Sequence, residues 1–190
     1  MYDLIYEYLN DNNVDAWVIY DYECNNPALL GLFGKRMLTR KCYVVFEKTH
    51  NAYILCHQID KVNLKDLEND FTIHTYKTWN ELLMLIDKKF NYHQVLMEIS
   101  ENGMLPRSST VDYGTVCLIK NYVKEITSSA NLLQHFSATI EGEALELYKK
   151  ACQLVNQIKD EAFMLISTKI RNNEIISEYD VQQFIMKRFL

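Results

Sequence analysis

The chain has 190 residues, and 48% of them are apolar, so it can bury a substantial core in one domain, or in one domain plus part of another. Its formal net charge of −5 argues against a nucleic-acid-binding protein, because contacts to phosphates need clustered Lys and Arg. No run of about 18 apolar residues could span a membrane. The N-terminal segment also lacks the basic and apolar parts of a signal peptide, so we expect a cytoplasmic protein.

The N-terminal part of the chain shows one helical pattern followed by three strand patterns. Apolar residues at helical spacing predict a short opening helix around Leu4–Leu9. Runs rich in apolar and β-branched residues then predict strands at Val14–Tyr20, Lys41–Glu47 and Asn51–His57. The connection between the last two runs is short enough for an antiparallel hairpin.

Further along, strand and helix patterns alternate. Strands are predicted at Phe71–Tyr76 and Gln94–Ile99, with a helix between them. A second helix is predicted at Asp112–Val123, with Asp112 as its N-cap, and a short strand and a short helix follow it. The alternation and the hairpin together indicate an α/β fold class, with a mixed β-sheet flanked by helices.

The pattern changes near residue 138, beyond which no strand is predicted. We expect Thr139 to cap a helix of about 30 residues with one apolar stripe from Ala144 to Leu165. The segment Arg171–Glu174 ends that helix, and a capping box of Ser177 and Asp180 starts the last one. The expected division is therefore an α/β domain at 1–138 and a helical segment at 139–190.

No motif in the chain predicts a catalytic residue or a metal ligand. Gly31 and Gly34 do not form a P-loop, because two residues rather than four separate them and a strand follows; we expect both to permit turns. Asn26-Pro27 is likewise a turn signal. The five histidines show no metal-binding spacing, and the five cysteines include no C-x-x-C motif, so we expect reduced thiols that are mostly buried.

Two carboxylates remain as a possible exception. Glu98 and Glu101 could form an acid–base pair just after a predicted strand. A carboxylate at a strand end is more often part of a hydrogen-bonded structure, and this interpretation is favoured.

Three stretches in order resemble the creatinase, prolidase and Xaa-Pro aminopeptidase family. NNPALLGLFGKRMLTRKCYVVF resembles part of the family's N-terminal domain, and MEIS followed by STVDYGTVCLIK resembles the end of that domain. EALELYKKACQLVNQIKDEAFMLI with SEYDVQQFI resembles the first two helices of the catalytic domain, which has the pita-bread fold. Asn25 stands where the family often has Ser, and Lys41 stands where many members have a second Arg.

The resemblance implies a truncated enzyme. The family's two divalent metal ions are held by two aspartates, a histidine and two glutamates that lie downstream of the segment matched by Gln182–Ile185. This chain is therefore expected to hold no metal and no catalytic residue, and only the complete parent enzyme would bind the ions and a peptide substrate. The implied role of the chain is subunit assembly and substrate access in a homo-oligomer, without nucleic acid or membrane as a partner.

The resemblance also implies candidate contact residues. In relatives, the loop before the second strand helps to form subunit contacts, and an arginine there can approach a neighbouring active site. Arg40 matches that position best, followed by Arg36, and Asn26 lies in the same motif. The planar, permanently charged guanidinium group suits a grip on a carboxylate. Alternatively, both arginines are solvated loop residues.

Two other interpretations stay open at this stage. The chain could be a stand-alone binding or oligomerisation module without a catalytic partner domain, or an unrelated α/β enzyme whose site the sequence does not reveal. Continuation of the native reading frame past Leu190 into spaced Asp, Asp, His, Glu and Glu residues would favour the truncated peptidase.

Overall fold

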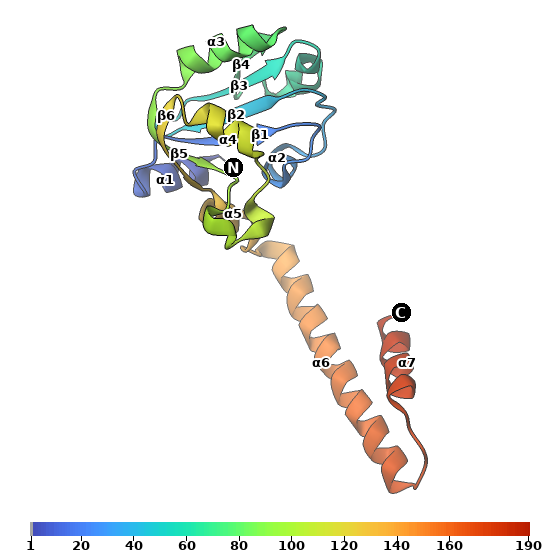
Figure 1. Cartoon of the computed structure of the whole chain (residues 1–190). Helices are drawn as coiled ribbons and strands as arrows, with labels where there is room; N and C mark the ends of the chain where they lie inside the picture. Colours follow the sequence, from blue (N-terminus) through green and yellow to red (C-terminus); the bar gives the residue numbers. More distant parts are fainter. Residues whose placement is uncertain (1) are drawn as a thin grey trace. The chain divides into compact units, whose positions relative to one another are not determined.

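A computed structural model describes residues 2–190, apart from the side chains of residues 136 and 137. The chain divides into two compact units, Met1–Ser137 and Ala138–Leu190. The first contains strands and helices and the second contains helices (Figure 1). The predicted fold class, a mixed sheet flanked by helices and followed by a helical segment, is confirmed.

The first unit is built on a six-stranded sheet with the strand order β4-β3-β2-β1-β5-β6. Strand β1 pairs antiparallel with β2, and β2 with β3, whereas β3–β4, β1–β5 and β5–β6 are parallel pairs. The hairpin predicted between β2 and β3 is therefore confirmed. The strands are Ala16–Asp21 (β1), Cys42–Glu47 (β2), Ala52–His57 (β3), Thr72–Tyr76 (β4), Tyr92–Met97 (β5) and Val123–Ser128 (β6).

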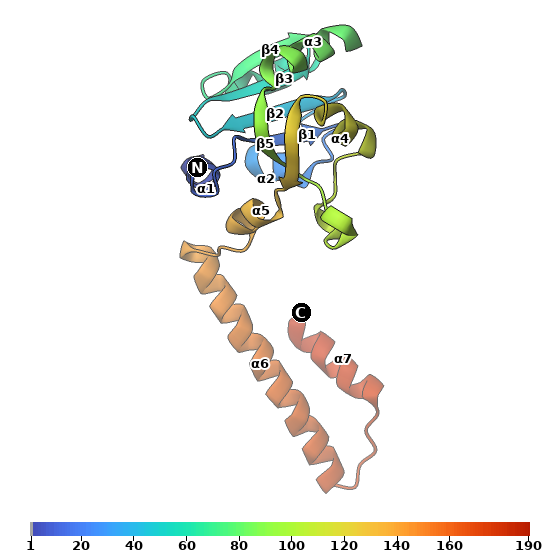
Figure 2. The ribbon, with the colours of Figure 1, turned by 60° about the vertical axis from the view of Figure 1, so that its left-hand side comes forward.

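Helices cover both faces of this sheet (Figure 2). One face packs against α1 (Asp3–Asp11), α2 (Pro27–Phe33), α5 (Ala130–Ser137) and the 3-10 helix η1 (Asp60–Leu67). The other face packs against α3 (Trp79–Lys89) and α4 (Tyr113–Ile119). Two short 3-10 helices, η2 (Glu101–Gly103) and η3 (Pro106–Ser108), lie in the connection before α4.

The side chains of β1 point alternately to the two faces of the sheet, and this explains why helices cover both faces. Trp17 and Ile19 belong to one core cluster, and Ala16, Val18 and Tyr20 belong to the other, as the period of two in a strand requires. Burial of each large apolar side chain stabilises the fold by about 1.5–3 kcal/mol. A strand that is apolar on both sides therefore needs helices on both faces.

Several local predictions were wrong in detail. Gly31 lies inside α2 rather than in a turn, because Asn26 caps this helix and Pro27 occupies its first position. Gly34 does adopt a turn conformation at the end of α2, with φ of 71°. Helix α4 ends at Ile119, since the next residues turn into β6.

The second unit consists of α6 (Gly142–Arg171) and α7 (Glu178–Phe189). The capping box of Ser177 and Asp180 is confirmed. Thr139 is not the N-cap of α6; Glu141 takes that position without a side-chain hydrogen bond. Only Ile158 and Ala162 are buried within the predicted apolar stripe of α6.

Candidate functional site

The candidate site is the arginine loop, residues 34–41, which connects α2 to β2 and carries both candidate arginines. The loop begins at Gly34, whose N–H donates to the carbonyl oxygen of Leu30 at 2.9 Å and ends α2. Its φ of 71° lies in the left-handed region that glycine adopts without steric cost. This geometry turns the chain out of α2 and toward η1.

Helix η1 presents one polar face to the arginine loop. A 3-10 helix has three residues per turn, so side chains three positions apart lie above one another. Asp60, Asn63 and Asp66 have this spacing, and all three bond to the loop. In the next row, Leu64 and Leu67 are buried in the core. The two buried leucines therefore pack η1 against the sheet. The three polar side chains, on the neighbouring face, bind the arginine loop.

Asp60 anchors the end of the loop at the start of β2. Its carboxylate is 1% exposed and accepts the backbone N–H of Thr39 at 3.1 Å and that of Arg40 at 3.0 Å. It also accepts the Thr39 hydroxyl at 3.0 Å. These three hydrogen bonds fix the backbone from which the Arg40 side chain projects.

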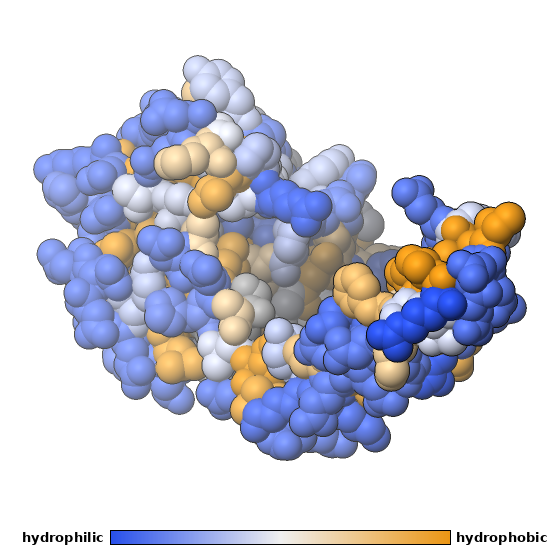
Figure 3. All heavy atoms as spheres, turned by 90° about the horizontal axis from the view of Figure 1, so that it is seen from below, coloured by the Kyte–Doolittle hydropathy of each residue, from blue (hydrophilic) through white to orange (hydrophobic). Residues whose placement is uncertain are grey.

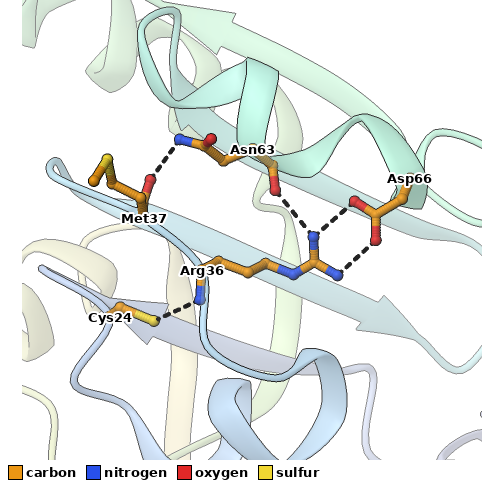
Figure 4. A network of polar contacts seen from close by, with 5 residues as sticks. All are labelled: Cys24, Arg36, Met37, Asn63 and Asp66. Atoms are coloured by element: carbon orange, nitrogen blue, oxygen red, sulfur yellow. Dashed lines mark hydrogen bonds and ion pairs between the residues drawn. The ribbon is translucent and has the colours of Figure 1, made fainter.

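The side chain of Arg36 points toward η1 and forms hydrogen bonds with residues of this helix (Figure 4). Its two terminal nitrogens donate to the two carboxylate oxygens of Asp66, each at 2.7 Å, and Nη1 also donates to the carbonyl oxygen of Asn63 at 2.9 Å. The hydrogen bond to Asp66 raises the pKa of the Arg36 guanidinium. These three hydrogen bonds through Nη1 and Nη2 tie the loop to η1, while the buried Nε of Arg36 has no hydrogen-bond partner among the described residues.

Arg40 has a different environment. Its side chain is exposed, and the one hydrogen bond of its guanidinium among the described residues runs from Nη1 to the carbonyl oxygen of Thr39, at 3.0 Å. Most of its N–H donors are therefore available to a group outside the chain. The structure thus separates two arginines that the sequence treats as alternatives: Arg36 is bonded within the chain, and Arg40 is exposed.

Asn26, the third candidate, is 3% exposed and lies at the start of α2. Its Oδ1 accepts the N–H of Ala28 at 2.8 Å as the cap of α2. Its Nδ2 donates to the carbonyl oxygen of Tyr20 at 2.8 Å and to Oε2 of Glu98 at 2.7 Å. These contacts make Asn26 a buried link between the start of α2, strand β1 and Glu98.

Glu98 is the centre of a buried network. Besides Asn26, it accepts a hydrogen bond from Nε1 of Trp17 at 2.7 Å and one from the Ser129 hydroxyl at 3.0 Å. Burial raises the pKa of its carboxyl group, although these hydrogen bonds oppose the shift. Glu98 is 1% exposed whereas Glu101 is exposed in η2, which confirms the hydrogen-bonded-structure interpretation of Glu98.

Other candidate groups do not assemble into a site. Within residues 2–190, no group of three or more His, Cys, Asp or Glu side chains is placed to hold a metal ion. The five cysteines are free; Cys42 and Cys56 are buried, but Cys117 and Cys152 are exposed, contrary to expectation. No helix in the described part of the chain is long and apolar enough to cross a membrane.

Comparison with known proteins supports the fold. No protein-family model matches the chain, and no curated protein sequence matches it. Among solved structures, the chain is similar to the X-Pro aminopeptidase from Thermotoga maritima MSB8, with 11% identity and a TM-score of 0.55 over 99% of this chain and 48% of that one. It is also similar to the prolidase from Pyrococcus horikoshii OT3, with 15% identity and a TM-score of 0.54 over 98% and 47% of the two chains.

A third match concerns the first unit alone. The creatinase/prolidase N-terminal domain of an X-Pro dipeptidase from Streptococcus pyogenes aligns over 70% of this chain and 95% of its own length, with 9% identity and a TM-score of 0.53. The chain therefore has the creatinase/prolidase N-terminal fold, as the sequence resemblance implied. It spans about half the length of the two longer enzymes that it matches.

Proposed function

We propose that this chain is the non-catalytic N-terminal portion of an Xaa-Pro aminopeptidase- or dipeptidase-like metallopeptidase. The observation that carries the proposal is the fold of the first unit, which is that of the creatinase/prolidase N-terminal domain. The similarity to two longer peptidases continues over nearly the whole chain, including its helical segment. The chain would serve subunit assembly and substrate access rather than bond cleavage.

Peptide hydrolysis by the complete enzyme would need metal ligands that the described residues do not supply. Hydrolysis by metal-activated water needs a cluster of carboxylate and imidazole ligands for two divalent ions. No such cluster forms among residues 2–190, so the donor set here does not fit the metal centre. We assign no catalytic step to this chain, and the peptide substrate belongs to the complete enzyme.

Arg40 is the residue proposed to act at a neighbouring subunit. Asp60 accepts the N–H of Arg40 and Asp66 binds the side chain of Arg36, so hydrogen bonds anchor the loop at both arginines while the guanidinium group of Arg40 faces outward. A preorganised arginine loses little conformational freedom when it grips a carboxylate. This arrangement suits either a contact between subunits or a group at the entrance to a neighbouring active site.

The first test concerns activity. We expect the purified 190-residue chain to show no cleavage of Xaa-Pro dipeptides or longer Xaa-Pro peptides, with or without added manganese, cobalt or zinc. The measurement is release of the N-terminal amino acid over time. Metal-dependent cleavage that follows the protein through purification would contradict the proposal.

The second test concerns Arg40 in the complete enzyme. Loss of a hydrogen-bonded charge costs about 1.5–3 kcal/mol, so Arg40→Ala should lower kcat/KM about 13- to 160-fold while the fold and assembly persist. Lys35→Ala is the matched control, because Lys35 is exposed in the same loop. If both variants have the same kcat/KM as the unsubstituted enzyme, Arg40 has no role in substrate access.

A stand-alone binding or oligomerisation module is the second candidate. It is favoured by exposed apolar side chains in the arginine loop, at Met37, and next to or within η1, at Ile59 and Val62. Sequencing the native gene past the codon for Leu190 separates the two candidates. A following segment with spaced Asp, Asp, His, Glu and Glu residues supports the peptidase, and a stop codon supports the module.

A further inference from the structure

Two cysteines face each other across the antiparallel hairpin of β2 and β3. In the register of these strands Tyr43 lies opposite Leu55, so the next pair toward the start of β2 is Cys42 opposite Cys56. Both cysteines belong to the core cluster on the face that packs against α1 and α2. They are 1% and 0% exposed, and both are free thiols. The chain therefore buries two free thiols on one face, in directly opposite positions.

The backbone geometry at this pair suits a disulfide. The N–H of Glu47 donates to the carbonyl oxygen of Asn51 at 2.8 Å, so these two opposite residues form a hydrogen-bonded pair. Hydrogen-bonded and non-hydrogen-bonded pairs alternate along antiparallel strands, and Cys42 lies an odd number of positions before Glu47. Cys42 and Cys56 are therefore a non-hydrogen-bonded pair, in which the Cα atoms are about 4.5 Å apart. Disulfides join residues whose Cα atoms are about 4.4–6.8 Å apart.

A third cysteine lies near the same face but has no such placement. Cys24 is partly buried against the same cluster, and its Sγ accepts the N–H of Arg36 at 3.4 Å. It follows the end of β1, so no strand register sets it opposite another cysteine. The strand register therefore singles out Cys56 as the partner of Cys42.

We propose that Cys42 and Cys56 are a redox-active pair that closes reversibly into a cross-strand disulfide in the presence of a peroxide. One thiolate attacks an oxygen of hydrogen peroxide and breaks the O–O bond, which leaves a sulfenic acid and, after protonation, one water. The second thiol attacks the sulfenic sulfur, forms the S–S bond and releases a second water. Together the two thiols give two electrons and two protons to one peroxide. The inference does not rest on the proposed function.

Burial keeps the pair reduced until it meets an oxidant. Burial raises the pKa of the Cys42 thiol well above its usual range, and Cys56 and Asp21 raise it further. Burial also raises the pKa of the Cys56 thiol to about 12. The thiolate is the reacting form, so the first step is slow and depends on local opening of the strand ends, where both cysteines lie. The second step is intramolecular and therefore fast.

Peptide mapping of the full chain tests the pairing. Cys117 and Cys152 are exposed, so both are first replaced by Ser. The folded chain is treated with hydrogen peroxide, the remaining thiols are alkylated, and the protein is digested with trypsin without reduction. Trypsin cuts after each Lys, so the two cysteines fall in separate peptides, 42–48 and 49–61.

The expected product is a linked pair of these two peptides. Its mass is that of both peptides less two hydrogen atoms, and it should be about tenfold or more abundant than any linkage to Cys24, because the register raises the effective concentration of one thiol at the other. The proposal is overturned if both peptides stay alkylated after peroxide treatment. It is also overturned if Cys24 is linked as often as Cys56.

Urea separates the effect of the hairpin from the effect of sequence distance. In concentrated urea the strands are lost, and the cost of closing a loop depends only weakly on its length. The preference of Cys42 for Cys56 over Cys24 should therefore nearly disappear. A preference as strong in urea as in the folded chain would contradict the role of the strand register.

Moving one thiol to the other face is the matched control. Cys56→Ala combined with Leu55→Cys keeps the number of cysteines but shifts the thiol by one position, to the opposite face of the sheet. Because Leu55 is buried, Cys56→Ala alone serves as a second, milder control. Neither variant should form an internal disulfide at Cys42, and a linkage to position 55 as abundant as that to Cys56 would contradict the proposal.

The last measurement concerns reversibility. A Cα separation of about 4.5 Å lies at the short end of the disulfide range, and bonds away from the preferred geometry are more easily reduced. Reduced glutathione should therefore restore both thiols, seen as the return of the two alkylated peptides. A bond that resists glutathione would be a structural disulfide, and the pair would not be a reversible redox site.

Discussion

Glu98→Leu should lower the unfolding free energy of the first unit by about 3–5 kcal/mol. The carboxylate is the acceptor for Trp17, Asn26 and Ser129, which come from β1, the cap of α2 and the start of α5. Each buried donor left without an acceptor costs about 1–3 kcal/mol. Relief of the burial cost of the carboxylate offsets only part of this loss.

Urea unfolding monitored by the fluorescence of Trp17 and Trp79 measures the effect. Glu101→Leu is the control, because Glu101 is exposed three residues away, and it should change stability by less than about 0.5 kcal/mol. Similar stability of both variants would show that the network contributes little.

The protonation of Glu98 gives the same network a pH dependence. Burial raises the pKa of this carboxyl group above its ordinary value of 4.5, so the folded state binds the proton more tightly than the unfolded state. The stability from this linkage is fully present below the unfolded pKa and is lost as the pH rises through the folded pKa. Relative to Glu98→Gln, the parent chain should therefore gain stability as the pH falls from neutral toward 4.5. Parallel stability curves for the two proteins would contradict this.

The strands could be predicted from sequence because their signal is local. Apolar β-branched runs such as that of β1 need no distant partner to be recognised. Helix η1 was missed because its period of three differs from the helical and strand periods that were sought. A search for that period would find Asp60, Asn63 and Asp66 in one row and Leu64 and Leu67 in the next.

The arrangement of the candidate site could not be predicted from the sequence, because it depends on contacts between residues far apart in the chain. Arg36 and Arg40 are both basic residues of one loop, and nothing local separates them. Their difference arises because Asp66, thirty positions away, accepts two hydrogen bonds from Arg36. Asn26 was expected to be a contact residue, yet it is buried and its amide reaches Glu98, 72 positions away. Such pairings depend on strand order, which a single sequence does not give.

The helical unit has few internal contacts that could stabilise it. Of the residues of α6 and α7, only Ile158 and Ala162 are buried. A groove of about 320 Å³ between the helices is lined almost wholly by apolar side chains, including Val155, Ile185 and Phe189. The space-filling view likewise shows apolar residues, in orange, open at the molecular surface (Figure 3). The ion pair of Arg188 with Glu161 is exposed at both ends, and such pairs contribute little.

In dilute solution, backbone amides of α6 and α7 should therefore exchange with deuterium at least about 1,000-fold faster than those of β1 and β2. Local opening of a weakly packed helix costs close to nothing, whereas exchange in core strands needs global unfolding, which costs about 5–15 kcal/mol. Hydrogen exchange followed by mass spectrometry measures both regions in one sample. Val45→Ala, in the buried centre of β2, is expected to speed exchange in the sheet and to leave exchange in the helical unit unchanged. Equal protection of the two units at low concentration would mean that the helical unit has a stabilising partner within the chain.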